Sequence, residues 1–200
     1  MFRRVVFSLM LILGYAIEVH ATEETPPQDQ VLEQTAAPTG GDFTLQSING
    51  PVSTKDLRGK VLMLYFGYTK CPDVCPTSLA YITQTLHELS PNELKKVVSI
   101  FISVDPKRDD VQTLHDYVSY FHENFIGLTG SADEIAEVAK LYGAQYHEVD
   151  LPGSAFGYSV NHSSATYLID KKGELRLVFP HQTAPSIMLE GLRYLMAEGS

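Results

Sequence analysis

The sequence predicts an α/β domain in which helices flank a mostly parallel central sheet. Short continuous apolar runs, typical of strands buried on both faces, alternate with segments whose apolar residues recur every three or four positions. This alternation begins near Asp42 and recurs to the end of the chain without an internal repeat. A length of 200 residues, with 44% hydrophobic and 20% charged residues, suits one such domain with additional segments.

The first and strongest strand is expected at Val61–Phe66, a continuous apolar run that ends at a glycine. Leucine and isoleucine at helical spacing follow over Thr77–Leu89, and a second buried strand is expected at Val97–Val104. A hairpin closes the sheet, because residues 170–173 form a short polar turn that ends in glycine. The remaining expected elements are helices at Asp109–His122, Ser131–Tyr142 and Ala184–Met196, and strands at Phe125–Leu128, Gln145–Val149, Ala165–Ile169 and Glu174–Phe179.

The amino terminus has the features of an export signal. Arg3 and Arg4 precede an apolar run, Val5–Ile17, and residues that a signal peptidase tolerates follow it. The run is about 13 residues long, shorter than the roughly 20 that a spanning helix needs, and Glu18 closes it with a charge. Residues 1–21 are therefore assigned to a signal peptide in preference to an uncleaved anchor, which would tether the protein through residues 5–17. No cysteine follows the run, so a lipid anchor on a thiol is not expected.

A linker and one folded domain are expected after this segment. Residues 22–41 are rich in Glu, Gln, Thr, Pro and Ala without hydrophobic periodicity, which predicts a flexible linker. The folded domain is assigned to residues 42–197. The formal net charge of −9 argues against nucleic acid and anionic lipid as partners. An acidic surface can attract metal ions or basic partner faces, but solubility is the simpler interpretation.

The only two cysteines, Cys71 and Cys75, lie directly after the first buried strand and at the start of the following helix. Loops beyond the carboxyl ends of central strands are where α/β folds bind ligands. A helix N-terminus favours the anionic form of a thiol, so both sulfurs are candidate thiolates. Their i, i+4 spacing brings them to one face of a helical turn, where they can share a soft metal ion or form a disulfide.

Structural and functional interpretations of this pair compete. A structural disulfide suits an exported protein, but closing so small a loop stabilises by only about 2 kcal/mol or less, and a domain of this size does not need it. A closed structural zinc site needs four Cys or His ligands, whereas Cu(I) accepts fewer and softer ones. The sequence therefore favours a metal-binding or redox function for the two cysteines.

A family resemblance is carried by four segments, Tyr65–Pro76, Val104–Asp109, His162–Ser164 and Tyr167–Asp170. From Asp42 to Met196 the chain resembles the SCO/SenC family of copper proteins, and the motif at residues 71–76 is highly specific for it. The resemblance implies a thioredoxin-like fold that binds copper and supplies it to the binuclear copper centre of cytochrome c oxidase, or reduces the thiols of that centre.

By this resemblance Cys71 and Cys75 correspond to the family's two thiolate ligands and His162 to its histidine ligand. The donor chemistry agrees, since thiolates favour Cu(I) and an imidazole helps to accommodate Cu(II). His162 is expected in a loop that leads into the strand beside the one that carries the cysteines. His181, just after the hairpin, is kept as a rival ligand. Solvent-facing roles are expected for His87, His115, His122 and His147, and His20 lies in the signal segment.

Other residues near the motifs are expected to have structural roles. Asp73 is interpreted as a helix cap or a group that tunes thiolate charge, because a hard carboxylate is a poor ligand for Cu(I). Asp105 and Arg108 are not assigned catalytic roles, and Asp105, followed by proline, is expected to shape the loop beside the site. Asn161 stands where family members often have Asp, which leaves the orientation of the adjacent histidine open. The sequence also predicts that Asp109 and Asp110 start a helix. Tyr65, Phe66 and Tyr68 are expected in the core or in the walls of the site, and Tyr68 could instead be exposed.

Two further classes of thiol protein fit the sequence less well. Thioredoxin-like reductases usually have a cis-proline where this chain has Ser164, which weakens a general reductase function. The peroxidatic pattern Pro-x-x-x-Thr-x-x-Cys is absent upstream of either cysteine, so a peroxiredoxin-like peroxidase ranks lowest.

The favoured function is that of a copper metallochaperone, which binds and transfers its metal without turnover of its own. The alternative is a thiol–disulfide oxidoreductase that reduces the cysteines of the oxidase copper centre or acts in redox signalling. Expected partners are the copper-centre subunit of cytochrome c oxidase, and a second periplasmic copper chaperone or a thiol reductase. An exported, periplasmic location in a bacterium is expected, because the amino terminus does not resemble a mitochondrial presequence.

Overall fold

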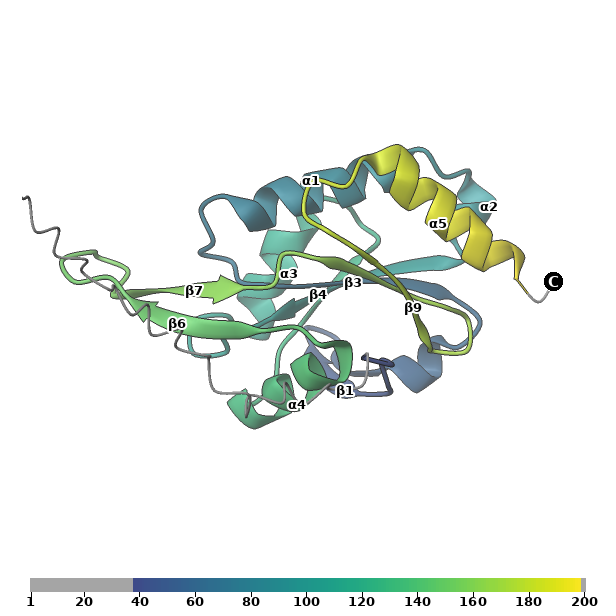
Figure 1. Ribbon diagram of the computed structural model, residues 1–200. Coiled ribbons are helices and arrows are strands. Elements are labelled where there is room, and N and C mark those ends of the chain that lie inside the picture. The colour runs from purple at the N-terminus through teal and green to yellow at the C-terminus, as the bar shows by residue number, and fades with distance from the viewer. Residues whose placement is uncertain (1–37, 199–200) are drawn as a thin grey trace, which may run out of the picture. The chain divides into compact units, whose positions relative to one another are not determined.

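A five-stranded sheet in the order β5-β4-β3-β8-β9 forms the centre of residues 38–198, the part that the computed structural model describes (Figure 1). The expected signal or anchor segment at residues 1–21 lies outside the described residues, as does most of the expected linker. The α/β class predicted from the sequence is confirmed. The strands of the sheet are β3 (Val61–Gly67), β4 (Val97–Ser103), β5 (Phe125–Leu128), β8 (Thr166–Ile169) and β9 (Leu175–Phe179).

The sheet is mixed, whereas the sequence predicted a mostly parallel one. β3 and β4 are parallel, as are β4 and β5, but β8 is antiparallel to both of its neighbours, β3 and β9. The predicted hairpin turn at residues 170–173 joins β8 to β9, and so short a connection permits only antiparallel pairing. β8 nevertheless lies beside β3, as expected, so the segment before β8 is brought to the end of the strand that precedes the cysteines.

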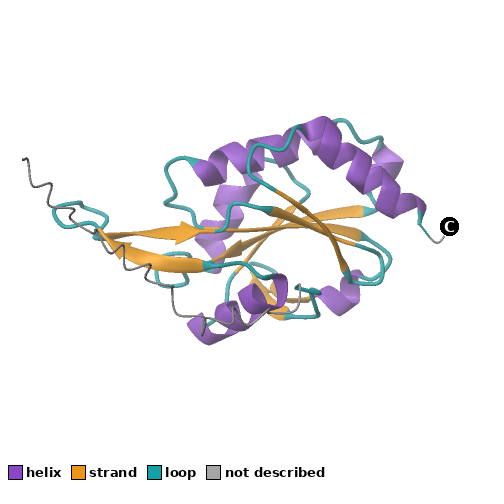
Figure 2. Ribbon diagram, in the orientation of Figure 1, coloured by secondary structure: helices purple, strands orange, loops and turns teal. Residues whose placement is uncertain are grey.

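Helices cover both faces of the sheet (Figure 2). The covering elements are α1 (Val74–His87), α3 (Val111–Ser119) and α5 (Pro185–Ala197) on one face, and α4 (Ala132–Tyr142), β1 (Thr44–Ser47) and β2 (Gly50–Ser53) on the other. Successive side chains of β3 point to opposite faces, so Met63 and Tyr65 pack with α1 while Leu64 and Phe66 pack with α4. All seven residues of β3 are buried, as the apolar run predicted. Within residues 38–198, no helix is both long and apolar enough to cross a lipid bilayer.

Several short elements were not predicted from the sequence. They are β1, β2, a 3-10 helix η1 (Thr54–Leu57), a single helical turn α2 (Pro91–Leu94) and β7 (Tyr158–His162). The β strands among them are only partly buried, so their apolar periodicity is weak. Helix α2 depends on a capping box between Ser90 and Glu93 and has no buried residues. Local hydrogen bonds therefore define these elements more than burial does.

Strands β6 (Tyr146–Asp150) and β7 form a separate antiparallel ribbon. Its register pairs Tyr146 with His162 and Asp150 with Tyr158. The strand expected at residues 145–149 is thus present, shifted by one residue, but it does not join the central sheet. Figure 1 shows the ribbon projecting beyond the end of the central sheet. Its base therefore delivers His162 to the edge at which β3 ends.

The described part of the chain begins with a short segment fixed to the domain by its backbone. Leu175 N donates a hydrogen bond to Thr39 O at 3.2 Å, and Gly40 N donates to Leu141 O at 3.1 Å. Tyr142 adds a side-chain contact, since its hydroxyl donates to Gly41 O at 2.8 Å. Residues 39–41 are therefore held against α4 and β9.

Candidate metal centre

The cysteine-bearing segment connects β3 to α1 at the carboxyl end of β3. Cys71 lies in the loop and is half-buried, whereas Cys75 lies in the first turn of α1 and is fully buried. Both are free thiols. Cys71 N donates a hydrogen bond to Tyr68 O at 3.2 Å, which makes the loop a tight turn. The position matches the prediction from the sequence, beyond the end of a central strand and at the mouth of a helix.

His162 completes a cluster of three donor groups. Its Nε2 atom lies 3.3 Å from Cys75 Sγ and 3.9 Å from Cys71 Sγ. The donor atoms of all three residues lie within 4.8 Å of one another, and they form the one group of three or more such side chains found among residues 38–198. His162 is the last residue of β7, whereas the sequence suggested a loop. Strand pairing with Tyr146 fixes its backbone more firmly than a loop would.

Two tyrosine rings enclose the imidazole of His162. The ring centres of Tyr65 and Tyr68 lie 6.1 Å and 5.8 Å from that of the imidazole, each in an edge-to-face arrangement. Tyr68 is only 3% exposed, so the sequence-based suggestion that it could be exposed was wrong. Phe66 points to the opposite face of the sheet and belongs to the core. The tyrosines are site walls that limit how far the imidazole can turn.

The carbonyl of the next residue orients the imidazole of His162. Nδ1 lies 3.2 Å from Ser163 O, and a carbonyl can only accept, so Nδ1 carries the proton and donates it. The lone pair of Nε2 then faces the two sulfurs, as a metal ligand requires. Asn161 is exposed and lies 3.4 Å from His147, because neighbouring residues of a strand point to opposite sides. The amide of Asn161 therefore points away from the imidazole of His162.

The two thiols differ in their pKa values. A hydrogen bond from the Cys75 thiol holds the pKa of Cys71 far below that of an ordinary cysteine, against the opposing effect of burial. Burial raises the pKa of Cys75 strongly, and its hydrogen bond to Cys71 adds to the effect. The metal-free site therefore holds one thiolate and one thiol, whereas the sequence offered both as candidate thiolates. The helix N-terminus does not overcome the burial of Cys75.

Asp73 occupies the N-cap position of α1, but its side chain makes no capping hydrogen bond. The predicted capping role was wrong for this side chain. Its backbone contributes instead, since the Asp73 N–H donates to the Cys71 sulfur and favours the thiolate.

The side chain of Asp109 holds the cysteine loop through Thr69, a role that the sequence analysis did not identify. The carboxylate is fully buried and accepts hydrogen bonds from Thr69 N at 3.0 Å, Thr69 Oγ1 at 2.6 Å and Ser103 Oγ at 2.7 Å. The sequence assigned Asp109 and Asp110 together to a helix start, but only Asp110 caps α3, accepting from Thr113 N at 2.7 Å. The position of Asp109 after β4 was the available signal, because parallel strands end at the same edge of a sheet.

The rival ligand His181 does not join the cluster. Its Nδ1 lies 2.9 Å from Ser78 Oγ, one turn further along α1 from Cys75. His87 and His122 form a pair with ring centres 5.1 Å apart, outside the group of metal donors. Of the histidines in the described residues, His162 alone lies against the thiols.

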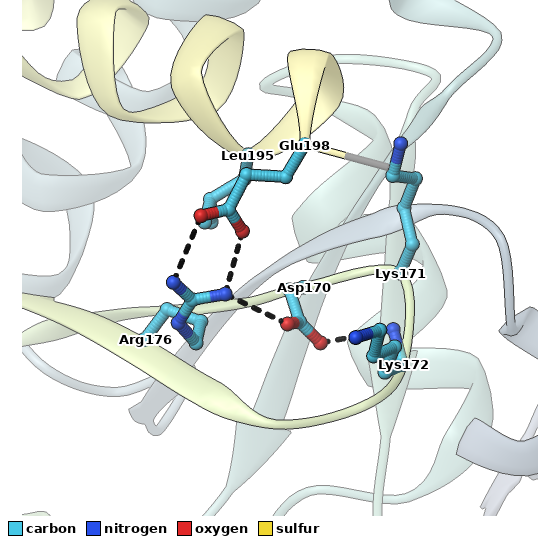
Figure 3. Close-up of a pocket in the computed structure, with 6 residues that line it drawn as sticks. All are labelled: Asp170, Lys171, Lys172, Arg176, Leu195 and Glu198. Carbon is cyan, nitrogen blue, oxygen red and sulfur yellow. Dashed lines mark hydrogen bonds and ion pairs between the residues drawn. The ribbon is translucent and has the colours of Figure 1, made fainter. Parts of the chain in front are cut away.

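A surface hollow of about 550 Å³ is lined by residues of the β8–β9 hairpin and of the chain's last helical turn (Figure 3). It lies beyond the end of β8, whereas the start of β8 pairs with the part of β3 that leads to the cysteines. Arg176 there donates to two oxygens of Glu198 at 2.6 Å and 3.0 Å and to Asp170 at 3.0 Å. Lys171 Nζ donates to Met196 O at 3.1 Å. Groups of the protein itself therefore engage Arg176 and Lys171.

The donor set at the cysteine site suits a soft metal ion. Two sulfurs and one imidazole nitrogen are fewer than the four Cys or His ligands of a structural zinc site. Thiolate sulfur is preferred by Cu(I), and imidazole is accepted by both oxidation states of copper. The half-buried position of Cys71 leaves an approach from solvent. The residues present therefore fit a copper ion that can enter and leave.

Comparisons with known proteins identify one family. A model of the SCO1/SenC family matches residues 32–197. An SCO2-like protein of Rickettsia conorii is 37% identical over 193 residues, which cover 94% of each chain. The structure of Arabidopsis thaliana ScoI with copper bound has a TM-score of 0.72 and 37% identity, covering 78% of this chain and 97% of that one. The structure of BsSco, a member of the Sco family of cytochrome c oxidase assembly proteins, has a TM-score of 0.64 and 26% identity, covering 81% and 95%.

Proposed function

We propose that this chain, which belongs to the SCO1/SenC family, is a copper metallochaperone that binds its metal through Cys71, Cys75 and His162. The observation that carries the proposal is the convergence of three donor atoms within 4.8 Å in a pair of free thiols and an oriented imidazole. Structures of the Arabidopsis thaliana and Bradyrhizobium japonicum ScoI proteins with copper bound support the choice of metal.

Copper is the cargo of this site, and the protein supplies two soft sulfur ligands and one harder nitrogen ligand. The two sulfurs satisfy Cu(I), and the imidazole adds the nitrogen donor that Cu(II) favours. Binding releases the proton that burial keeps on Cys75, so copper affinity depends on pH. After copper leaves, thiol–disulfide exchange with a disulfide of a partner protein can join the two sulfurs in a disulfide and reduce that partner to two thiols, which removes both thiolates from the ligand set.

The proposed receiver of the copper is the copper-centre subunit of cytochrome c oxidase. The description of BsSco as a member of a family of oxidase assembly proteins supports this proposal. A second periplasmic copper chaperone or a thiol reductase would complete the cycle, because the site must be loaded with copper and kept reduced.

We further propose export to the periplasm, directed by a signal or anchor at residues 1–21, which a linker at residues 22–41 joins to the folded domain; residues 39–41 of this linker are held against the domain. Arg3, Arg4 and the apolar run that follows them support export. Known relatives also include mitochondrial SCO2 homologues and a Bacillus anthracis lipoprotein of the same family, so membrane association occurs among similar proteins.

The alternative function, a thiol–disulfide oxidoreductase that reduces the cysteines of the oxidase copper centre or acts in redox signalling, has less support. Cys75 is fully buried, and the imidazole lies against both sulfurs, which leaves little room for an extended substrate backbone at the thiol pair. Cys71 is the reactive thiol by exposure and charge, so reduction of a partner would start there.

Copper titration of the reduced protein tests the proposed function. We expect saturation at about one equivalent of Cu(I) or Cu(II), with sulfur-to-copper charge-transfer absorption in the Cu(II) form. His162→Ala should weaken Cu(II) binding by about 10-fold or more. His147→Ala is the matched control, because His147 is exposed on the adjacent strand and lies outside the cluster. Unchanged Cu(II) binding in His162→Ala would refute the three-ligand site.

Activity in cells separates delivery from reduction. A deletion strain should regain cytochrome c oxidase activity when copper is added to the medium, because excess metal bypasses a delivery protein. Loss of oxidase activity that copper does not restore would instead favour the reductase function.

A further inference from the structure

The turn between β4 and α3 contacts both halves of the candidate metal centre. At its start, Val104 N donates a hydrogen bond to Gly67 O at 2.8 Å, which joins it to the end of β3. At its end, Asp109 holds the cysteine loop through Thr69. Between these two contacts lie Asp105 and Arg108, whose side chains reach the ribbon that carries His162.

Arg108 makes several contacts with the ribbon at the start of β7, at the opposite end of this strand from His162. Its Nη1 donates hydrogen bonds to Tyr158 O at 3.0 Å and Phe156 O at 3.3 Å. Its guanidinium carbon lies 3.7 Å from the centre of the Tyr158 ring, at which distance a cation over an aromatic face is attractive. Its Nε forms an ion pair with Asp105, and the Tyr158 hydroxyl donates to the other oxygen of that carboxylate at 2.7 Å.

The side chains of Arg108 and Asp105 are shielded from solvent, which makes the interactions between them stronger. The side chain of Arg108 is 19% exposed and that of Asp105 only 1%. Lys107, the preceding residue, also contacts the ribbon through Glu148, but this pair is 64% and 48% exposed. Exposed ion pairs contribute little to stability, whereas buried charge-assisted hydrogen bonds are stronger. Arg108 therefore carries more of the attachment of the ribbon than Lys107 does.

The ribbon needs such an attachment because it forms a sheet of its own. Two-stranded ribbons are marginally stable without further packing. Val160 supplies part of that packing, since its side chain is buried in the core. Arg108 holds the strand at Tyr158, on the far side of Val160 from His162. The direction of β7, and with it the position of the imidazole, thus depends on both contacts.

We propose that Arg108 is a positioning residue that sets how firmly His162 is held against the thiol pair, and through it the preference of the site for Cu(II) over Cu(I). This inference rests on the proposed copper-binding function. The cysteines are held separately, by Asp109 and the start of α1, so a looser ribbon displaces the imidazole and leaves the sulfurs in place. Cu(I) is satisfied by the sulfurs, whereas Cu(II) gains more from the nitrogen ligand.

The test compares the affinities of both oxidation states in Arg108→Ala and in the wild-type protein, each full-length and reduced. We expect Cu(II) affinity to fall by about 10-fold or more, as for loss of other residues that orient a ligand. Cu(I) affinity should change by less than about threefold, because the thiolates keep their positions. The reduction potential of the bound copper should therefore rise by about 59 mV for each tenfold change in the affinity ratio. The Cu(II) charge-transfer and paramagnetic resonance spectra should move toward those of His162→Ala.

Three further variants separate positioning from general stability. Lys107→Ala removes a neighbouring cation that also contacts the ribbon, and we expect a wild-type affinity ratio and spectrum. Tyr158→Phe keeps the aromatic ring but removes its hydrogen bond to Asp105, so we expect a smaller shift in the same direction. Arg108→Lys keeps the positive charge but lacks the planar guanidinium group with its several N–H donors. It should shift the ratio of Cu(II) to Cu(I) affinity even if Arg108→Ala does not fold.

The possible results are distinct. Equal losses of Cu(I) and Cu(II) affinity in the Arg108 variants would overturn the proposal and assign Arg108 a structural role only. Unchanged Cu(II) affinity and spectra in these variants would overturn it as well. Failure of the wild-type protein to bind copper, or wild-type behaviour of His162→Ala, would instead refute the proposed function itself.

Discussion

Replacement of Gly67 by alanine should damage the metal site and the core at once. Gly67 is the last residue of β3, and it is buried directly beneath the cysteine loop. Its φ is not in the left-handed region, so the backbone alone would accept alanine. A methyl group at this position would lie 2.7 Å from Cys75 Sγ, 2.9 Å from Phe101 Cε2 and 3.0 Å from Tyr65 Cε1. The cost of the substitution is therefore decided by packing.

The size of the effect follows from these distances. Ordinary contacts of a Cβ atom begin at 3.4 Å, so Cys75 Sγ must move by about 0.7 Å or the strand must shift. Metal–ligand distances tolerate changes of only about 0.2 Å, so we expect copper affinity to fall by about 10-fold or more. Overpacking of this kind costs about 1–3 kcal/mol, and each kcal/mol lowers the Tm of a protein of this length by about 2–4 °C.

Thermal unfolding of the metal-free protein and competition titration with copper measure the two effects separately. Gly127→Ala is the matched control. Gly127 is also buried in a strand of the central sheet, and its Cβ would lie 2.8 Å from Leu114 Cβ. It lies on β5, two strands away from β3, so we expect a similar loss of stability with unchanged copper affinity.

Two outcomes would contradict this reasoning. If Gly67→Ala and Gly127→Ala lowered the Tm equally but both bound copper like the wild-type protein, the position of Cys75 Sγ would not limit affinity. If Gly67→Ala left the Tm unchanged, the site would have room for a methyl group that the structure does not show.

Other residues yield further predictions. Asp109→Asn should lower the free energy of unfolding by about 1–3 kcal/mol in urea titrations, because an amide cannot accept all the hydrogen bonds that the buried carboxylate receives. In the metal-free protein, iodoacetamide should modify Cys71 before Cys75, at a rate that changes little between about pH 6 and pH 8, because the pKa of Cys71 is already far lower. The rate of Cys71 modification is measured by peptide mass spectrometry, and a tenfold rise in this rate per pH unit would contradict the prediction. Burial and the nearby His87 lower the pKa of His122. On acidification His122 therefore binds a proton at a higher pH in the unfolded chain than in the folded protein, so the free energy of unfolding should fall as the pH drops below about 6.5. His122→Gln should reduce this fall in urea titrations at about pH 8 and pH 5, and His115→Gln on the exposed side of α3 should not.

Much of the fold could be predicted because burial leaves a periodic pattern in the sequence. The runs that became β3, β4 and β5 are apolar because each strand is covered on both faces. The helices predicted from apolar spacing are present with ends shifted by a few residues, since hydrogen bonds of capping residues such as Asp110 decide the ends. β7 escaped prediction because most of its residues are only partly buried.

The candidate site was partly predictable for a different reason. Cys71 and Cys75 are neighbours in the sequence, so their spacing and their position after a strand already indicated a shared role. His162 was assigned from a resemblance to a family, supported by its place just before the strand expected beside the one that carries the cysteines. Its role as a ligand stays a prediction, and the structure supports it by placing the imidazole against both sulfurs.

The sequence by itself determined the α/β class, the buried strands, and the presence of two adjacent thiols at the end of the first of these strands. These features depend on residues close together in the chain, where periodicity and spacing are sufficient. Only the tertiary structure decided that β8 runs antiparallel to β3, that Asp109 supports the cysteine loop and that Arg108 holds the ribbon of His162. It also decided that Cys75 keeps its proton while Cys71 loses it. Each of these depends on residues that folding brings together from distant parts of the chain, and on how much water it excludes around them.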